Sequence, residues 1–402
     1  MAARLPADGP GVVVPRRARR QAPLRPRLRP GRPREAGPGH AGNALPHRLG
    51  DQAIHRRGDP APGAGRQALD RRPADEYFPG YPGGDAITLR HLLTHTSGLH
   101  NYTAHPDFFG RVTKPISEAD LVAWFRDDPP DFAPGAEWRY SNTNYVLLGQ
   151  IVEKVSGTTL ADYWQKTFFT PLGLHDTGVW VNATPPDHAA RGYSLKPGQT
   201  QLAPALDWDM TWAGGAGDLY STAADLWHWT EALQEGHVLA PDSLKTMLTE
   251  TTTVKKETLI RYAMGLAHSE LGGLPTIGHT GGLQGYASIV TWYPDQKTTV
   301  VVLSNALPAP PRTSPGELSL LAAHALLAPE MAAHAPKIDP TIDPKVYPDY
   351  ARRVRLPRRC GAADHGGERP PLRAVDRPEP VRDLPERPRR LLLQGRGSRA
   401  RL

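Results

Sequence analysis

The segment YSNTNYVLLGQIVEKVSG, residues 140–157, contains the clearest helical pattern in the chain. Gly157 suits the position directly after a helix end, because glycine adopts a left-handed backbone without a steric penalty. Tyr140 and Asn142 flank one residue where the helix is expected to start, so a phenol and an amide can face the same cleft. We therefore predict an amphipathic helix with four apolar residues on one stripe: Leu148, Ile151, Val152 and Val155.

Further helices are predicted on both sides of this segment. ITLRHLLTHTSGL (87–99) reads as a short amphipathic segment. Ser117 and Thr222 are followed three residues later by Asp120 and Asp225, which is a capping pattern typical of helix starts. Two more helices are predicted: LADYWQKTFF (160–169), expected to stop at Pro171, and GELSLLAAHALL (316–327).

Farther along the chain, the apolar period changes from that of a helix to that of a strand. GYASIVTWYP (285–294) and TTVVVLSN (298–305) are rich in β-branched and aromatic residues, and PDQK lies between them. This arrangement predicts a β-hairpin. Helices before and after an antiparallel hairpin favour a mixed α/β or α+β fold over a parallel, doubly wound sheet.

The basic residues are distributed unevenly. Residues 1–75 hold 16 Arg and residues 351–402 hold 15 Arg, whereas all 10 Lys lie in residues 76–350. The middle segment has 17 basic and 29 acidic residues, a balance of −12, so the two ends together carry +19. Such ends are typical of disordered arms that bind nucleic acid, or of solvated tails without a partner. A third interpretation, that the ends are not natural protein sequence, is favoured because residues 1–75 contain neither Lys nor Ser.

Several classes of site find no support in the sequence. Cys360 is the one cysteine, so we predict no disulfide framework, no metal site and no cofactor. No apolar run is long enough to span a bilayer, and we see no signal-peptide pattern. The G-x-S-x-G, H-E-x-x-H, P-loop and G-x-G-x-x-G signatures are absent. The cellular compartment is left open.

A second short constellation, GHTGG (278–282), is expected just before a strand. Its glycines let a ligand approach the backbone, while His279 and Thr280 offer an imidazole and a hydroxyl beside it. Taken alone, this pattern is more often a turn, and the Tyr-Ser-Asn pattern is more often a helix cap. Their order along the chain gives both patterns more weight.

Four separated motifs resemble, in this order, the serine β-lactamase and penicillin-binding-protein-like family: LLTHTSGL, YSN with VLLGQIVEKVSG behind it, GGAGDLYSTAADL and GHTGGLQGYAS. The resemblance covers roughly residues 76–335. The family includes class C-type β-lactamases, D-alanyl-D-alanine peptidases, D-aminopeptidases and esterases. It implies a mainly antiparallel sheet flanked by helices, a helical subdomain beside the sheet, and an active site between them.

The resemblance also implies roles for individual residues. In the family, a Ser-x-x-Lys pair at the start of a buried helix attacks an ester or amide and forms an acyl-enzyme. Tyr140 would be the phenol that shuttles the proton, and Asn142 would hold the substrate amide. His279 replaces the more usual Lys of the third motif and, being largely neutral near pH 7, grips a carboxylate less firmly; alternatively it only orients a loop. The implied substrate-binding residues are His279, Thr280, Gly281 and Gly282.

This replacement favours an esterase or a peptidase over β-lactam hydrolysis. The implied partners are small-molecule esters, amides or D-amino-acid peptides, and no nucleic acid is expected.

The nucleophile of the first motif is absent. Ser97 is the first serine in the chain, and no Ser-x-x-Lys occurs anywhere. If residues 48–59 are read one base later, the codons across Leu49–Gly50, Gly50–Asp51 and Asp51–Gln52 permit Ser, Val and Thr. The next codon, which ends in the first base of Ala53, permits only Lys or Arg. A shifted frame thus permits the missing Ser-Val-Thr-Lys.

The same shift also permits family-like strings over residues 25–47 and 376–395, the second resembling a small C-terminal β domain. We therefore predict a serine hydrolase gene whose ends are translated out of frame, so that the chain is inactive. The predicted segments are 1–75, out of frame and disordered; 76–335, a hydrolase domain lacking its N-terminal strands and nucleophile helix; 336–350, a linker; and 351–402, out of frame.

Two alternatives stay open. One is a non-catalytic protein whose Arg-rich arms bind nucleic acid. The other is a pseudoenzyme that keeps the cleft as a ligand pocket.

Overall fold

The computed structural model describes residues 71–334, apart from 183–184, 188, 196–200, 250–251, 255–259 and 309–312, together with two short strands at 12–13 and 39–40. Contacts divide the chain into Met1–Met331 and Ala332–Leu402, and the second unit contributes only residues 332–334 to the described part. The predicted segments 1–75, 336–350 and 351–402 lie almost wholly outside the described residues, and the division of the chain stays a prediction.

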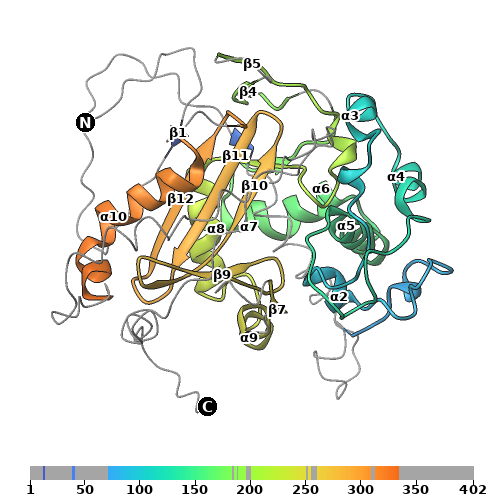
Figure 1. Cartoon of the computed structure of the whole chain (residues 1–402), viewed down its shortest axis with the longest axis horizontal. Coiled ribbons are helices and arrows are strands. Elements are labelled where there is room, and N and C mark those ends of the chain that lie inside the picture. Colours follow the sequence, from blue (N-terminus) through green and yellow to red (C-terminus); the bar gives the residue numbers. More distant parts are fainter. Residues whose placement is uncertain are drawn as a thin grey trace, which may run out of the picture. The chain divides into compact units, whose positions relative to one another are not determined.

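A seven-stranded antiparallel sheet forms the centre of the first unit, with the strand order β1-β12-β11-β10-β9-β8-β7 (Figure 1). The hairpin predicted over 285–305 is confirmed, because β11 and β12 pair from Ala287↔Ser304 to Tyr293↔Thr298. The mainly antiparallel mixed fold is also confirmed. The strands are β1 (Val12–Val13), β7 (Thr252–Thr253), β8 (Arg261–Tyr262), β9 (Ala267–Leu271), β10 (Leu274–Leu283), β11 (Tyr286–Tyr293) and β12 (Thr298–Ser304).

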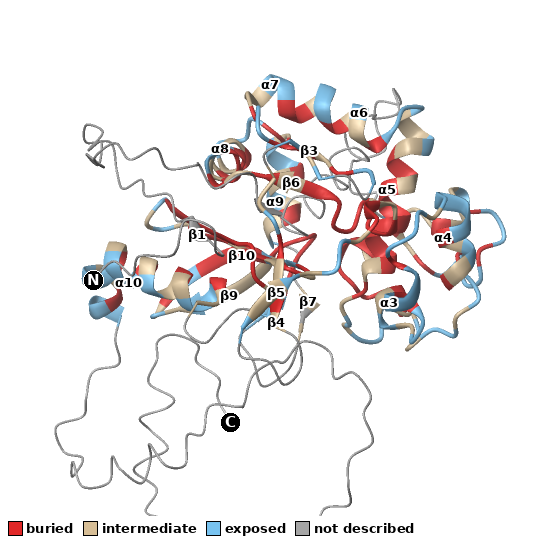
Figure 2. Cartoon of the chain, turned by 90° about the horizontal axis from the view of Figure 1, so that it is seen from above, coloured by how far each residue is buried: buried red, intermediate tan, exposed pale blue. Residues whose placement is uncertain are grey.

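Strand β12 is buried along its whole length, and its apolar residues are the four at 300–303. Successive side chains of a strand point to opposite faces. Val300 and Val302 therefore pack in the cluster formed with α10 (Pro315–His334), whereas Val301 and Leu303 belong to the larger core on the other face. Figure 2 shows the buried residues on the strands and on the helix faces that meet them.

The helices lie on both faces of the sheet and in a group beside it (Figure 1). Their bounds are α2 (Leu89–Leu93), α3 (Phe108–Arg111), α4 (Glu118–Phe125), α5 (Asn142–Ser156), α6 (Leu160–Trp164), α7 (Thr170–Leu172), α8 (Ala223–Gln234) and α9 (Pro241–Thr249), with 3-10 turns η2 (Ala74–Glu76), η3 (Tyr102–Ala104) and η5 (Met210–Trp212) and a π-helical segment η4 (Gln165–Phe169). Two small sheets accompany them, β2 (Gly39–His40) with β6 (Leu219–Ser221) and β3 (Gly178–Val179), and β4 (Tyr193–Leu195) with β5 (Leu202–Pro204).

Helix α5 forms as predicted, but residues 143–149 are all buried, so its first two turns are covered on every side rather than along one stripe. Leu148, Ile151 and Val152 are at most 1% exposed, and Gly157 ends the helix with a left-handed φ of 69°. The predicted caps are confirmed as well, since the Ser117 and Thr222 side chains accept hydrogen bonds from the backbone N–H groups of Asp120 and Asp225.

Two helix ends differ from the prediction. The helix that begins at Leu160 does not stop at Pro171 but continues through η4 and α7 to Leu172. Pro171 lies just after the π-helical segment, at the second residue of α7. Helix α10 extends past the expected end at Leu327, with a kink at that residue.

Two short strands lie in a segment for which we predicted no native strands. β1 pairs with β12 and β2 pairs with β6, each over two residues. None of the helices that the structure describes combines the length and apolar character needed to cross a membrane.

Candidate active site

Tyr140 is held in place by the segment that follows α2. The backbone N–H of Arg139 donates to the carbonyl of His95 at 3.0 Å, and the N–H of Ser141 donates to His95 Nδ1 at 3.2 Å. These two bonds bracket Tyr140, whose ring centroid lies 4.3 Å from that of His95. The LLTHTSGL and YSN motifs therefore form one structural unit, although more than 40 residues separate them.

His95 occupies the centre of an aromatic cluster. Its side chain is fully buried, and its ring centroid lies 5.1 Å from Tyr145, 5.0 Å from Tyr262 and 6.2 Å from Trp138. Nδ1 accepts hydrogen bonds from Ser141 N and from Asn144 Nδ2, which places the ring proton on Nε2. Burial, reinforced by the nearby His279, holds the pKa of His95 well below its usual range, so the imidazole is neutral.

The turn after His95 is in close contact with two other segments, which contain Phe132 and Asn144. Ser97 Oγ donates to Asn144 Oδ1 at 2.6 Å and accepts from Leu99 N at 3.1 Å. Gly98 has a φ of +80°, and a Cβ at this position would lie 1.9 Å from the carbonyl oxygen of Phe132. Only glycine fits there, so the turn packs closely against the loop that carries Phe132, between α4 and α5.

The GHTGG motif lies inside β10 rather than just before a strand, which corrects the sequence prediction. His279 pairs with Val290 of β11, and Gly281 and Gly282 pair with Ser288 and Ala287. The turn falls later, between β10 and β11. The sequence misled because the glycines indicated a turn, whereas pairing with β-branched residues of β11 keeps this stretch extended.

Both ring nitrogens of His279 have hydrogen-bond partners. Nδ1 donates to the carbonyl of Thr280 at 2.5 Å, so Nε2 is left as the acceptor of the Tyr262 hydroxyl at 3.1 Å. Tyr262 is fully buried, and burial raises its pKa well above its usual range, so it keeps the proton that it donates.

The structure brings the Tyr140 and His279 rings together, whereas the Asn142 side chain is bound to other residues. The Tyr140 and His279 rings, from motifs 139 residues apart, have centroids 6.2 Å from each other. Asn142 instead donates from Nδ2 to Asn101 Oδ1 and Thr103 Oγ1, each at 3.3 Å. No hydrogen bond joins Asn142 to Tyr140 or His279 among the described residues.

The arrangement supplies a phenol and two imidazoles, but the serines near it serve the fold. Ser97 is bound to Asn144, and Ser141 Oγ donates to the carbonyl of His100 at 3.3 Å; both side chains are buried. Within the described part of the chain, no group of three His, Cys, Asp or Glu residues is placed to hold a metal ion.

Sequence reasoning missed two residues of this cluster. His95 lies within the LLTHTSGL motif. A histidine between a helix and a turn that contains glycine could have been chosen as a candidate site residue. Tyr262 had no such signal, because only the pairing of β8 and β9 brings it beside β10.

The chain is similar to known proteins in sequence and in fold. A family model described as Beta-lactamase matches residues 63–324. Penicillin-binding protein 4* of Bacillus subtilis (strain 168) is 32% identical over 247 residues, which are 58% of this chain and 54% of the relative. The putative penicillin-binding protein PbpX of the same organism is 31% identical over 179 residues, 44% of this chain and 43% of the relative. The chain thus spans about half the length of the curated relatives that it matches.

Solved structures show the same fold. A D-stereospecific amidohydrolase from Streptomyces sp. superposes with a TM-score of 0.62 at 26% identity, over 72% of this chain and 86% of that chain. The D-amino acid amidase of Ochrobactrum anthropi SV3, complexed with L-phenylalanine amide, gives a TM-score of 0.61 over 72% of this chain and 84% of that chain, and at 22% identity it supports the fold alone. The chain belongs to the Beta-lactamase family, and its fold is that of the serine β-lactamases and penicillin-binding proteins.

Proposed function

We propose that this gene encodes a serine hydrolase that cleaves an amide or ester through an acyl-enzyme, and that the chain as printed is inactive. The observation that carries the proposal is the approach of Tyr140 and His279, whose ring centroids lie 6.2 Å apart although their motifs are separated by 139 residues. A phenol and an imidazole at the junction of α5 and β10 suit proton transfer and substrate orientation.

Each site residue has a proposed role. Tyr140 shuttles the proton between nucleophile and leaving group, and Asn142 holds the substrate amide after exchanging its bonds to Asn101 and Thr103. His279 is neutral and orients the strand, with Thr280, Gly281 and Gly282 lining the substrate side. His279 in this state offers no charge to a substrate carboxylate, which favours neutral amide or ester groups at this position.

An open strand edge supports a substrate with a peptide-like backbone. β9 pairs with β10 only from Leu274 to Gly278, whereas β11 pairs with β10 as far as Leu283. Among the described residues, the stretch 280–282 therefore has no strand neighbour on the β9 side. An extended amide can add there by strand pairing.

The substrate class that we propose is a D-amino-acid amide, ester or peptide. A D-stereospecific amidohydrolase is among the similar structures, and the family resemblance of the sequence motifs implies D-amino-acid peptides among the substrates. Residues 1–75 and 351–402 are proposed to be out of frame, so that the Ser and Lys of the first motif are encoded but not translated. Loss of the nucleophile and its base leaves little beyond binding.

The test compares the printed chain with an equally long chain in which residues 25–73 are restored to the shifted frame. We expect the restored chain to hydrolyse D-phenylalanine amide or a p-nitrophenyl ester and to be labelled by a fluorophosphonate, and the printed chain to do neither. Replacing the restored serine by Ala is the matched control and abolishes both signals. A folded restored chain that does not react with these substrates, or a printed chain whose turnover a serine-directed inhibitor blocks, contradicts the proposal.

A further inference from the structure

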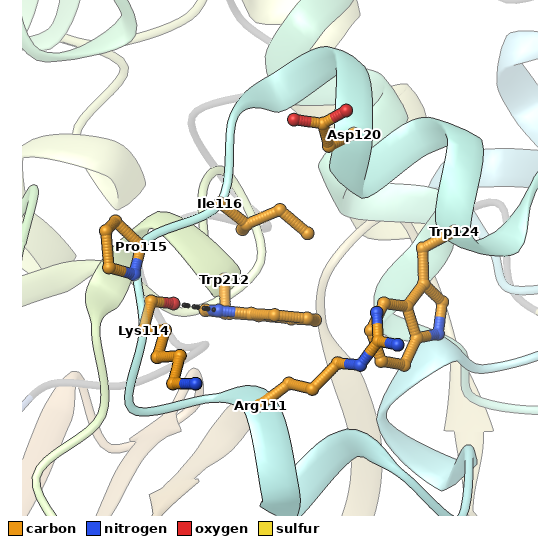
Figure 3. A pocket seen from close by; sticks show the side chains of 7 residues that line it. All are labelled: Arg111, Lys114, Pro115, Ile116, Asp120, Trp124 and Trp212. Carbon is orange, nitrogen blue, oxygen red and sulfur yellow. Dashed lines mark hydrogen bonds between the residues drawn. The ribbon is translucent and has the colours of Figure 1, made fainter.

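A pocket of about 510 Å³ lies between the end of α3, the start of α4 and η5 (Figure 3). Its volume falls in the range of small-molecule sites, roughly 300–1,000 Å³. None of its residues belongs to the cluster around Tyr140 and His279. The lining residues are Arg111, Lys114, Pro115, Ile116, Asp120, Trp124 and Trp212.

Hydrogen bonds to residues 209–212 hold the floor of this pocket. Trp212 Nε1 donates to the carbonyl of Lys114 at 2.6 Å, as Figure 3 shows, and Ile116 N donates to Thr211 Oγ1 at 3.0 Å. The N–H of Asp209 donates to the carbonyl of Val112 at 2.8 Å. Three hydrogen bonds thus join segments that are about 100 residues apart in the sequence, so these segments are held in position before any ligand binds.

The pocket has a surplus of positive charge. The Arg111 guanidinium lies 4.5 Å from the centroid of the Trp124 ring, which leaves its in-plane N–H groups available to a ligand. Neither Arg111 nor Lys114 forms an ion pair with any residue in the described part of the chain. Asp120 is the one carboxylate among the lining residues. It accepts a hydrogen bond from Ser117 Oγ at 2.6 Å at the start of α4.

The remaining walls are apolar and flat. The rings of Trp124 and Trp212 meet edge to face, with centroids 5.0 Å apart and an interplanar angle of 85°. Ile116 and Pro115 complete this side, and Figure 3 shows the Ile116 side chain above the Trp212 ring. Trp212 is only 2% exposed, so the apolar surface that a ligand can reach is that of Pro115, Ile116 and the exposed part of Trp124, which suits an aromatic or otherwise flat apolar body.

We propose that this pocket binds a small carboxylate with an aromatic body, its carboxylate on Arg111 and Lys114 and its ring against Pro115, Ile116 and the exposed part of Trp124. The site is separate from the proposed hydrolase centre and does not depend on it, because it uses none of the residues of that centre.

Isothermal titration of the full chain with 2-naphthoate tests the proposal, with neutral 2-naphthamide as the matched ligand. We expect naphthoate to bind and the amide to bind roughly tenfold more weakly or not at all, since a charge-assisted hydrogen bond is lost. Arg111→Gln is expected to weaken naphthoate binding by roughly tenfold or more, and Trp124→Leu to weaken it through the lost stacking. High salt is expected to weaken it as well, because exposed charges are screened.

Two variants locate the ligand. Lys166→Gln removes a positive charge from η4, far along the chain from the pocket, and is expected to leave binding unchanged. Tyr140→Phe alters the candidate active site and is also expected to leave it unchanged. Equal binding of acid and amide, loss of binding in Lys166→Gln, or loss in Tyr140→Phe overturns the proposal. A tripeptide such as Ala-Ala-Phe that binds while naphthoate does not would assign the pocket to peptide ends and likewise overturn it.

Discussion

His95 joins the helical and sheet sides of the candidate active site. Its ring contacts Tyr140 on one side and Tyr262, the partner of His279, on the other. Its backbone has a φ of 57°, a left-handed conformation that few non-glycine residues adopt and that often marks functional sites. The sequence could suggest this histidine as a candidate, but its contacts depend on three segments that meet only in the folded chain.

Asp218 is a buried acid outside the site. It is 4% exposed, and its Oδ1 has no hydrogen-bond partner among the described residues. Burial raises the pKa of Asp218 to about 7, although backbone N–H groups oppose the shift. The half-buried Glu153 behaves similarly, since burial and a hydrogen bond with Glu118 raise its pKa to about 7.

Asp218 is therefore expected to make stability depend on pH. The unfolded carboxyl loses its proton near pH 4 and the folded one near pH 7, so the contribution is complete below pH 4 and is lost as pH rises to 7. The Asp218→Asn variant cannot ionise and is expected to match the parent at pH 4 and to exceed it at pH 8 by up to ~4 kcal/mol in free energy of unfolding. Urea titrations at several pH values measure this difference. Asp218 also contributes to the raised pKa of Glu153, so Glu153→Gln is titrated alongside as a control. Parallel pH curves of the parent and Asp218→Asn would rule out this role of Asp218.

A helix boundary can be predicted from the sequence where a single capping residue sets it. The capping residues Ser117 and Thr222 and the terminal Gly157 were predictable, because the hydrogen bond or backbone conformation involved spans only a few residues. Pro171 was misleading, since a π-helical segment before it changes its position within the helix. The sequence does not reveal the π-helical segment, because that segment is associated with tertiary packing. Trp164, Phe168 and Phe169 all pack in the core.

The cap of α8 gives a prediction for a single element. Thr222 Oγ1 accepts a hydrogen bond from Asp225 N at 3.2 Å. Thr222→Ala is expected to lower the free energy of unfolding by about 1 kcal/mol, because one N–H at the helix start loses its partner. Thermal unfolding measures the loss. Thr222→Ser keeps the acceptor and should retain most of the stability, and Thr113→Ala, at an exposed position, should change it by less than about 0.5 kcal/mol. Equal losses in Thr222→Ala and Thr222→Ser would mean that the cap is not the cause.

At the scale of the molecule, the proposed frame error predicts a chain that lacks part of its core. The denaturant dependence of the free energy of unfolding, the m-value, scales with the surface exposed on unfolding. The frame-restored chain is therefore expected to have a larger m-value and a higher midpoint than the printed chain of equal length, by guanidinium titration. Identical m-values in two folded chains would show that the restored segment adds no buried surface. Resequencing the gene across the codons for residues 65–80 and 345–358 locates the shift independently.

The sequence by itself determined the helices with clear periodicity, the hairpin of β11 and β12, the order of the family motifs and the absence of Ser-x-x-Lys, because each of these is recorded within a short stretch of residues. Only the tertiary structure decided that GHTGG is extended within β10, that both nitrogens of His279 are occupied, and that His95 and Tyr262 belong to the same cluster as Tyr140. The cluster depends on contacts between residues 17 to 167 positions apart, and such contacts form when the sheet and helices pack together.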